Sequence, residues 1–320
     1  MKYVAMRALS TSLVVLSFTS AHAQTPSLPL RLWVASYGSD SSTACAFTSP
    51  CQTFNRALQI ATPGSEIDCI DSVAAEGLGI DKSVTINCEG AMATTGQKLN
   101  TWVFGITNIS VGATDTVVLR GLHINYQRSG FSFNFSGAGK LVLEKMHIGG
   151  GQNGIMFSPN GPAHLVVKDS TIDTNGNGSS GAGIRVVPSG NGSARVTLER
   201  VTVTSNTFGI AVDGTDSTAG INATISNSTM SSNANDGIVA VTSEGHAPIG
   251  VTVTNSRSTN NGYGIRSIGP NVTVRVKNSE IVGNGIGLKA SSSGALLTLG
   301  NNTVEANGSD GAFTGSVAQK

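Results

Sequence analysis

Four side chains in two turn-rich segments suit acid–base chemistry. Asp213 and Asp216 lie in one segment, and Glu244 and His246 lie in a similar segment further along the chain. Carboxylates and an imidazole held close together can transfer protons or hold a cation. The neighbouring residues are Gly, Ser and Thr, and Asp-Gly-Thr-Asp is also a common turn sequence. These four residues are therefore candidate catalytic residues, and an ordinary pair of turns is the alternative.

Two histidines, His123 and His147, are 24 residues apart and follow similar strand-like sequences. If the two strands are neighbours, the imidazoles stack about 4.8 Å apart. A stacked pair can bind a metal ion or an anionic sugar. It can also be a surface pair that continues a column of Thr171, Thr202 and Thr229. His123 and His147 are thus weak candidates for binding.

A repeat of about 26 residues must position these side chains. Each unit contains two or three alternating apolar and polar runs separated by Gly, Asn and Ser, which predicts short strands joined by bends. A unit of this length is too short for a propeller blade and fits one coil of a parallel β-helix. One apolar position marks each coil and is filled by Leu119, Leu143, Val167, Leu198, Ile225, Val253, Val276 and Leu299.

Equivalent residues of successive coils must stack in such a fold. Asn recurs at one bend, where its side-chain amide can hydrogen-bond the amides above and below; this column contains Asn175, Asn206, Asn233, Asn261, Asn284 and Asn307. A second bend carries Asn227, Asn255, Asn278 and Asn301, followed by the inward column Ser228, Ser256 and Ser279. We expect the outward charges Arg120, Glu144, Lys168 and Glu199 to alternate in sign. Phe131 and Phe133 are expected to stack on Ile155 and Phe157.

The N-terminal part has a different pattern. Residues 53–61 place Phe54, Ala57 and Leu58 on one face of a short helix, which predicts a cap over the first coil. Two similar segments, around Cys69 and Cys88, predict two shorter coils at residues 64–90. Four cysteines allow three pairings. We favour disulfides Cys45–Cys51 and Cys69–Cys88, with buried free thiols at Cys69 and Cys88 as the alternative.

The first 23 residues have the features of a signal peptide. Lys2 and Arg7 precede a short apolar stretch, and Ala21-His22-Ala23 is a typical cleavage site. The apolar stretch is too short to span a bilayer, and we expect no membrane span elsewhere. The protein is therefore expected to be exported to the periplasm, the cell surface or the extracellular medium, which also favours disulfides.

The composition excludes several classes of protein. The chain has 40 Gly among 320 residues, 12% charged residues and a formal net charge of +1. An apolar fraction of 39% argues against disorder. Gly has no three-residue period, which excludes collagen. The low net charge gives no electrostatic footprint for nucleic acid, so no nucleic-acid partner is expected.

One resemblance covers nearly all of the mature chain. The motifs Gly38-Ser39-Asp40, Pro50-Cys51, residues 63–67 and residues 80–86, together with the N-S-x-I-x-x-N-x-x-G-I units, resemble exported proteins of the right-handed parallel β-helix, or pectate-lyase-like, superfamily. The resemblance implies a right-handed solenoid. It does not imply one function, because this fold carries lyases, hydrolases, esterases, epimerases and adhesins. The catalytic motifs of the superfamily's hydrolases and epimerases are absent from the sequence.

These observations predict an all-β chain: a signal peptide at 1–23, an N-terminal segment and capping helix at 24–63, and a parallel β-helix of about ten coils at 64–320. We expect a non-catalytic protein that contacts polysaccharide or a cell-envelope component. One alternative is a polysaccharide lyase or glycoside hydrolase, and another is an adhesion or assembly module. No cofactor or metal is expected, except Ca²⁺ under the lyase alternative.

Overall fold

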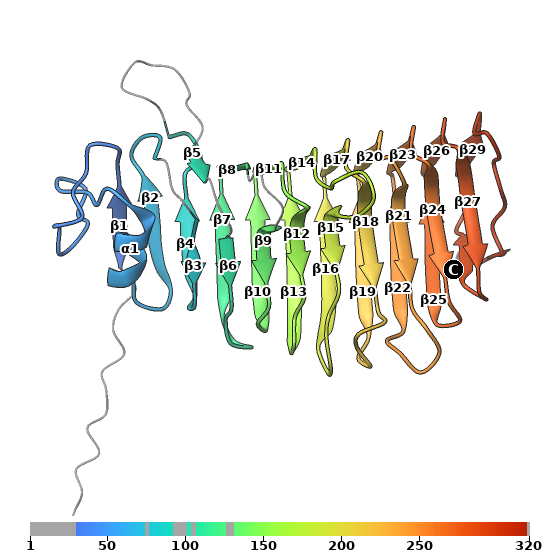
Figure 1. Ribbon diagram of the computed structural model, residues 1–320, viewed down its shortest axis with the longest axis horizontal. Helices are drawn as coiled ribbons and strands as arrows, with labels where there is room; N and C mark the ends of the chain where they lie inside the picture. The colour runs from blue at the N-terminus through green and yellow to red at the C-terminus, as the bar shows by residue number, and fades with distance from the viewer. Residues whose placement is uncertain (1–29, 74–76, 92–100, 104–106, 126–130, 319–320) are drawn as a thin grey trace, which may run out of the picture.

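The computed structural model describes residues 30–73, 77–91, 101–103, 107–125 and 131–318. The predicted signal peptide lies outside these residues. Within them, strands of three parallel sheets stack side by side along the long axis, from the N-terminal end to the C-terminal end (Figure 1). No helix in the described ranges is long and apolar enough to cross a membrane.

The first sheet has twelve strands, which pair in the order given: β1 (Arg31–Val34), β2 (Ser65–Cys69), β4 (Val84–Asn87), β7 (Thr116–Arg120), β10 (Gly139–Glu144), β13 (Pro162–Lys168), β16 (Ser193–Glu199), β19 (Ile221–Ser226), β22 (Ile249–Thr254), β25 (Val272–Lys277), β28 (Ala295–Thr298) and β30 (Gly315–Ser316). The second sheet has nine shorter strands: β5 (Thr101–Val103), β8 (Leu122–Asn125), β11 (His147–Gly149), β14 (Thr171–Asp173), β17 (Thr202–Thr204), β20 (Thr229–Ser231), β23 (Arg257–Thr259), β26 (Glu280–Val282) and β29 (Thr303–Glu305).

The third sheet also has nine strands: β3 (Gly79–Ile80), β6 (Thr107–Ile109), β9 (Phe131–Phe135), β12 (Asn153–Phe157), β15 (Ala182–Val186), β18 (Phe208–Asp213), β21 (Asp236–Val241), β24 (Tyr263–Ile268) and β27 (Ile286–Ser291). Eight coils, from the one that begins at β4 to the one that begins at β25, have a described strand in all three sheets. The predicted number of ten also counted the incomplete coils at the two ends.

The predicted register is confirmed through most of the repeat. The apolar marker column runs in register from Leu119 to Val276. The prediction of Leu299 as the last residue of this column was wrong, because Thr298 lies opposite Val276. The phenylalanine alignment was also wrong by two residues: Phe133 pairs with Ile155, and Phe135 stacks on Phe157 with ring centroids 4.8 Å apart. Alternation alone did not distinguish the two phenylalanine registers, since a two-residue shift keeps the same face inward.

The N-terminal predictions are confirmed. Helix α1 (Phe54–Ile60) begins at Thr53, whose hydroxyl accepts the backbone N–H of Arg56, and it packs beside β1 at the N-terminal end (Figure 1). Disulfides join Cys45 to Cys51 and Cys69 to Cys88. The two short segments around Cys69 and Cys88 are neighbouring strands, β2 and β4, with Ile67 opposite Ile86.

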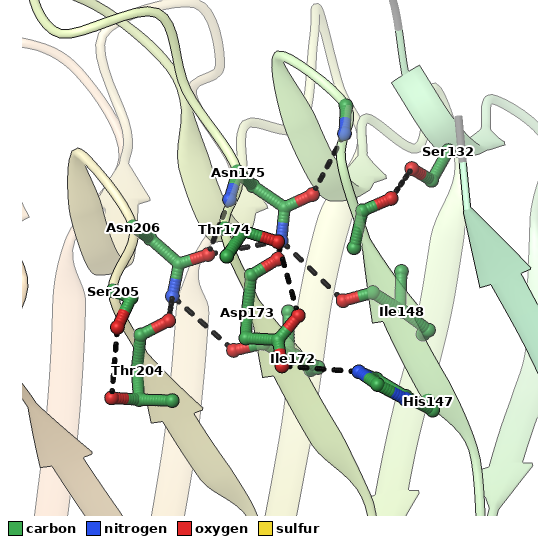
Figure 2. A network of polar contacts seen from close by, with 12 residues as sticks. Ser132, His147, Ile148, Ile172, Asp173, Thr174, Asn175, Thr204, Ser205 and Asn206 are labelled. Carbon is green, nitrogen blue, oxygen red and sulfur yellow. Dashed lines mark hydrogen bonds and ion pairs between the residues drawn. The ribbon is translucent and has the colours of Figure 1, made fainter. Parts of the chain in front are cut away.

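The asparagine column forms a buried ladder with one direction. Both the backbone N–H and the side-chain Nδ2 of Asn175 donate to Oδ1 of Asn206, at 3.0 and 2.9 Å (Figure 2). The same pair of bonds joins each Asn to the next as far as Asn307. At the C-terminal end, Oδ1 of Asp310 accepts both bonds from Asn307. Each interior amide therefore satisfies a neighbouring coil as well as its own bend.

Two further columns complete the coil-to-coil contacts. Asn227, Asn255 and Asn278 have φ between 48° and 51°, the left-handed conformation that Asn tolerates at a bend. The buried hydroxyls of Ser228, Ser256 and Ser279 each accept a backbone N–H from the preceding coil. In the charge column, Arg120 donates to Glu144 at 2.6 Å.

Removal of one rung of the ladder should destabilise the fold. Asn206→Ala leaves the buried backbone N–H of Asn175 without its acceptor. It also removes the side-chain N–H bonds to Asn233 Oδ1 and to the backbone carbonyls of Ile172 and Thr204. We expect a loss of about 3 kcal/mol in the free energy of unfolding, because each unsatisfied buried group costs about 1–3 kcal/mol. Urea unfolding followed by circular dichroism measures this loss. The control Asn222→Ala changes an exposed Asn and should stay within about 0.5 kcal/mol of the parent protein.

Candidate functional site

A groove of about 520 Å³ lies on the outer face of the first sheet, where β7, β10, β13, β16 and β19 begin. Three basic side chains project into it from adjacent strands: Lys140, His164 and Arg195. The strand register places Lys140 beside His164 and His164 beside Arg195. Neighbouring strands are about 4.8 Å apart, so the three residues form one basic column across three coils.

The basic column contains no compensating acid. In the part of the chain that the structure describes, neither Lys140 nor Arg195 forms an ion pair. The charges of Lys140 and Arg195 lie two strands apart on one face with His164 between them, so no opposite charge separates them. The neighbouring outward column instead alternates in sign, as in the Arg120–Glu144 pair. Since this arrangement does not favour folding, we regard the column as the strongest candidate for a binding function.

His164 is adapted to its place between two cations. Its Nε2 lies 3.2 Å from the hydroxyl oxygen of Thr197. Partial burial, and then the charges of Lys140 and Arg195, lower the pKa of His164 below its usual value. The imidazole is therefore neutral at pH 7, which relieves the repulsion within the column.

Asp115 lies at one end of the groove. Its carboxylate accepts hydrogen bonds from the Ser83 hydroxyl at 2.6 Å and from the Gly112 backbone N–H at 2.9 Å. The bond from Ser83 is the main reason why the pKa of Asp115 is lowered. The carboxylate is thus ionised and fixed, so it bounds the groove with a negative charge and is poorly suited to accept a proton.

The sequence contained a signal for the basic column that the repeat analysis did not use. Lys140, His164 and Arg195 each lie three residues before a marker residue, namely Leu143, Val167 and Leu198. The analysis of charge followed the position immediately after each marker, where signs alternate. A search of every column for charges of one sign would have found the groove.

The structure brings the predicted acidic segments onto neighbouring coils, but the side chains do not form one cluster. Asp213 ends β18, accepts from Arg185 at 3.3 Å, and accepts the Thr215 hydroxyl at 2.6 Å. Asp216, Glu244 and His246 are exposed. No hydrogen bond or ion pair joins the Glu244 or His246 side chain to another described residue. A catalytic role for these four residues stays a prediction.

The predicted histidine stack is present on the second sheet. His123 and His147 are in register, and their rings lie edge to face with centroids 5.3 Å apart. His147 Nε2 lies 3.0 Å from Asp173 Oδ2 (Figure 2), and this carboxylate fits because residue 149 is Gly: a Cβ there would lie 2.7 Å from Asp173 Oδ1. Burial and then His147 lower the pKa of His123. No group of three His, Cys, Asp or Glu side chains is arranged for a metal ion among the described residues.

A buried ion pair on the third sheet is the other unusual polar group. Asp236 is fully buried, and its Oδ2 accepts from Arg266 at 2.5 Å while Oδ1 has no hydrogen-bond partner in the described structure. Arg266 also lies over the ring of Tyr263, 4.6 Å from the centroid. Burial raises the pKa of Asp236 to about 6, despite the opposing effect of Arg266.

Comparison with known proteins supports the fold. No family model and no curated protein matches the sequence. Among solved structures, the pectate lyase Pel9A is 15% identical, with a TM-score of 0.58, and the match covers 92% of this chain and 79% of the lyase. The chain is a right-handed parallel β-helix.

Two other solved β-helix proteins match less well. A rhamnogalacturonan lyase is 12% identical with a TM-score of 0.45, and the match covers 86% of this β-helix and 75% of the lyase. The A-module of the Azotobacter vinelandii mannuronan C-5 epimerase AlgE4 is 12% identical with a TM-score of 0.36, covering 80% and 91%. At these identities the similarity concerns the fold alone.

Reversal of one charge in the basic column should stabilise the β-helix. Arg195→Glu places an acid beside His164 and separates no existing ion pair. Because the imidazole is neutral at pH 7, the opposite-charge pair forms only when His164 gains its proton at lower pH. Under those conditions we expect the free energy of unfolding to rise by about 0.5 kcal/mol, the usual size of an opposite-charge pair across strands. Thermal unfolding measures the change, with Arg195→Gln as a neutral control expected between the two. A lower stability for Arg195→Glu would contradict the repulsion described above.

Asp236 should make stability depend on pH. Its pKa is about 6 in the folded protein and 3.8 in the unfolded chain, so the folded state binds the proton more tightly. The stability that protonated Asp236 contributes is complete below about pH 4 and is lost as the pH rises through about 6. The free energy of unfolding of the parent protein should therefore fall relative to that of Asp236→Asn as the pH rises over this range. The exposed control Asp216→Asn should give no comparable decrease.

Proposed function

We propose that this β-helix is an exported, non-catalytic protein that binds an anionic polysaccharide, or an anionic component of the cell envelope, through the basic groove. The observation that carries the proposal is the stacked column of Lys140, His164 and Arg195 without a described acidic partner. An extended polyanion lying across the strands would meet one basic side chain per coil and would compensate the repulsion between them.

The kind of anion follows from the size and charge of the groove. Three basic residues and a formal net charge of +1 give too little positive charge for nucleic acid, whose binding requires many phosphate contacts. The open groove crosses five strands and continues from Arg195 to the amide of Asn222, which can hydrogen-bond sugar hydroxyls. The structural neighbour named pectate lyase acts on an anionic polysaccharide of this kind.

The non-catalytic part of the proposal rests on how two candidate acids are engaged, Asp115 in the groove and Asp213 on the third sheet. Asp115 is held by Ser83 and Gly112, and Asp213 is held by Arg185 and Thr215. A general acid or base needs a proton that it can exchange with substrate, and these fixed carboxylates are poorly suited to that task. Export is supported by the two disulfides, which persist in oxidising compartments.

Binding of polygalacturonate tests this proposal. We expect saturable binding by isothermal titration calorimetry at low salt, a loss of affinity as salt increases, and no binding of neutral dextran in the groove. Lys140→Ala and Arg195→Ala should each weaken binding by about threefold to tenfold, since each removes one charge from the groove. Lys277→Ala, on the same face but outside the groove, is the matched control and should change affinity less than twofold.

Two further measurements complete this experiment: the affinity for polygalacturonate at lower pH, and a test for release of products from it. Because the pKa of His164 is lowered, the imidazole is uncharged at neutral pH and gains its charge as the pH falls. Affinity should therefore rise with falling pH, and His164→Gln should abolish the rise. The proposal would be contradicted if the parent protein does not bind polygalacturonate, or if Lys140→Ala and Arg195→Ala bind it as tightly as the parent protein does. Release of unsaturated products or reducing ends that Asp213→Asn abolishes would show that the protein is an enzyme.

A further inference from the structure

A second hollow, of about 420 Å³, lies in the loop between β1 and α1 at the N-terminal end of the β-helix. Nine residues line it, and none of them carries a charge. One of them is Tyr37, whose side chain is 63% exposed. The hydroxyl side chains around it belong to Ser39, Ser41, Ser42, Thr43, Thr48 and Ser49. The hollow thus combines one aromatic face with many neutral hydrogen-bonding groups.

The charged residues near this hollow are already engaged. Asp40 Oδ1 accepts the backbone N–H groups of Gln52 and Thr53, both at 2.9 Å, where it holds the start of α1. Arg56 donates to the backbone carbonyl of Ser42 from Nε at 3.2 Å and from Nη2 at 3.0 Å. A ligand in the hollow therefore meets hydroxyls and an aromatic ring, and this set favours a neutral molecule over an ion.

The loop around the hollow is fixed before any ligand binds. The Cys45–Cys51 disulfide closes it, and the Ser39 backbone N–H donates to the Pro50 carbonyl at 3.0 Å. Residue 38 must be Gly, because a Cβ there would lie 2.3 Å from the Cys51 carbonyl oxygen. A site formed in advance loses little conformational entropy on binding, which favours measurable affinity from a small contact area.

Exposed aromatic residues are concentrated in this loop. Among the described residues, the large hydrophobic side chains that are exposed include two aromatic ones, Tyr37 and Phe47, and both lie in it. Phe47 packs edge to face on Trp33, with ring centroids 5.0 Å apart, and it does not line the hollow. Tyr37 lines the hollow and is exposed, so its ring is available to a ligand.

We propose that this loop hollow is a binding site for a neutral saccharide, separate from the basic groove. Sugars have apolar C–H faces that pack on an aromatic ring and hydroxyls that exchange hydrogen bonds with Ser and Thr. In this site the sugar ring covers Tyr37, and its hydroxyls contact the side chains of the surrounding serines and threonines. The protein would then hold two kinds of glycan, or two parts of one, at different places.

Calorimetric titration of the full mature protein with neutral hexasaccharides tests the proposal. The probes are β-1,4-glucan, β-1,4-mannan and β-1,4-xylan hexasaccharides. We expect at least one to bind with a Kd below about 1 mM, and we expect Tyr37→Ala to raise that Kd at least tenfold. Tyr37→Phe keeps the ring and should raise it less than threefold. Unchanged thermal unfolding of both variants shows that the loop stays folded.

Two controls separate this site from other surfaces. Phe47→Ala removes an exposed aromatic of the same loop that does not line the hollow, and it should change the Kd less than twofold. Lys140→Ala should leave neutral saccharide binding unchanged, while Tyr37→Ala should leave polygalacturonate binding unchanged. This inference would be overturned if none of the three hexasaccharides binds, or if Tyr37→Ala binds them as tightly as the parent protein. Either result would leave the proposal for the basic groove unaffected.

Discussion

The buried asparagine ladder is the constraint on which the rest of the molecule depends. Each rung fixes the bend of its own coil and the register of the next, because one Oδ1 accepts both a backbone and a side-chain donor. The sequence separation between rungs varies from 31 residues, between Asn175 and Asn206, to 23, between Asn261 and Asn284. The ladder continues through this variation, so the additional residues lie in loops away from it. The loops are therefore free to differ while the scaffold stays regular.

A fixed register also determines what a charged residue meets. In an in-register parallel stack, each outward side chain faces the residue at the same position in the coils on either side. Alternation of sign is the stable solution, and Arg120 and Glu144 follow it. The basic groove departs from this solution in three successive coils and includes an imidazole whose pKa is lowered by burial and then by its basic neighbours. A place where like charges are kept close together on an otherwise regular scaffold therefore points to a functional site.

The sequence predicted the parts of the structure that repeat. The strand columns, the asparagine and serine ladders, the capping helix and both disulfides follow from periodic residues, because stacking requires equivalence. The errors lie where the period weakens: at the last coil, where Thr298 replaces Leu299 in the marker column, and at Phe133, where two registers keep the same face inward. The candidate sites were harder to predict, since the Tyr37 hollow depends on the path of a single non-repeating loop. Lys140, His164 and Arg195 were accessible to sequence analysis, but only as a column and not as a motif.

The C-terminal end of the ladder has a consequence for assembly. Asn175 starts the ladder by accepting the Gly151 backbone N–H, and each later amide accepts from the rung before it. The last donor, Asn307, donates to the carboxylate of Asp310. A carboxylate accepts hydrogen bonds but has no N–H to pass on. Asp310 therefore acts as a chain terminator: it completes the last rung and leaves nothing for a second molecule to propagate. A solenoid whose coils stack so readily within one chain is in this way prevented from growing into a fibre through its own ladder.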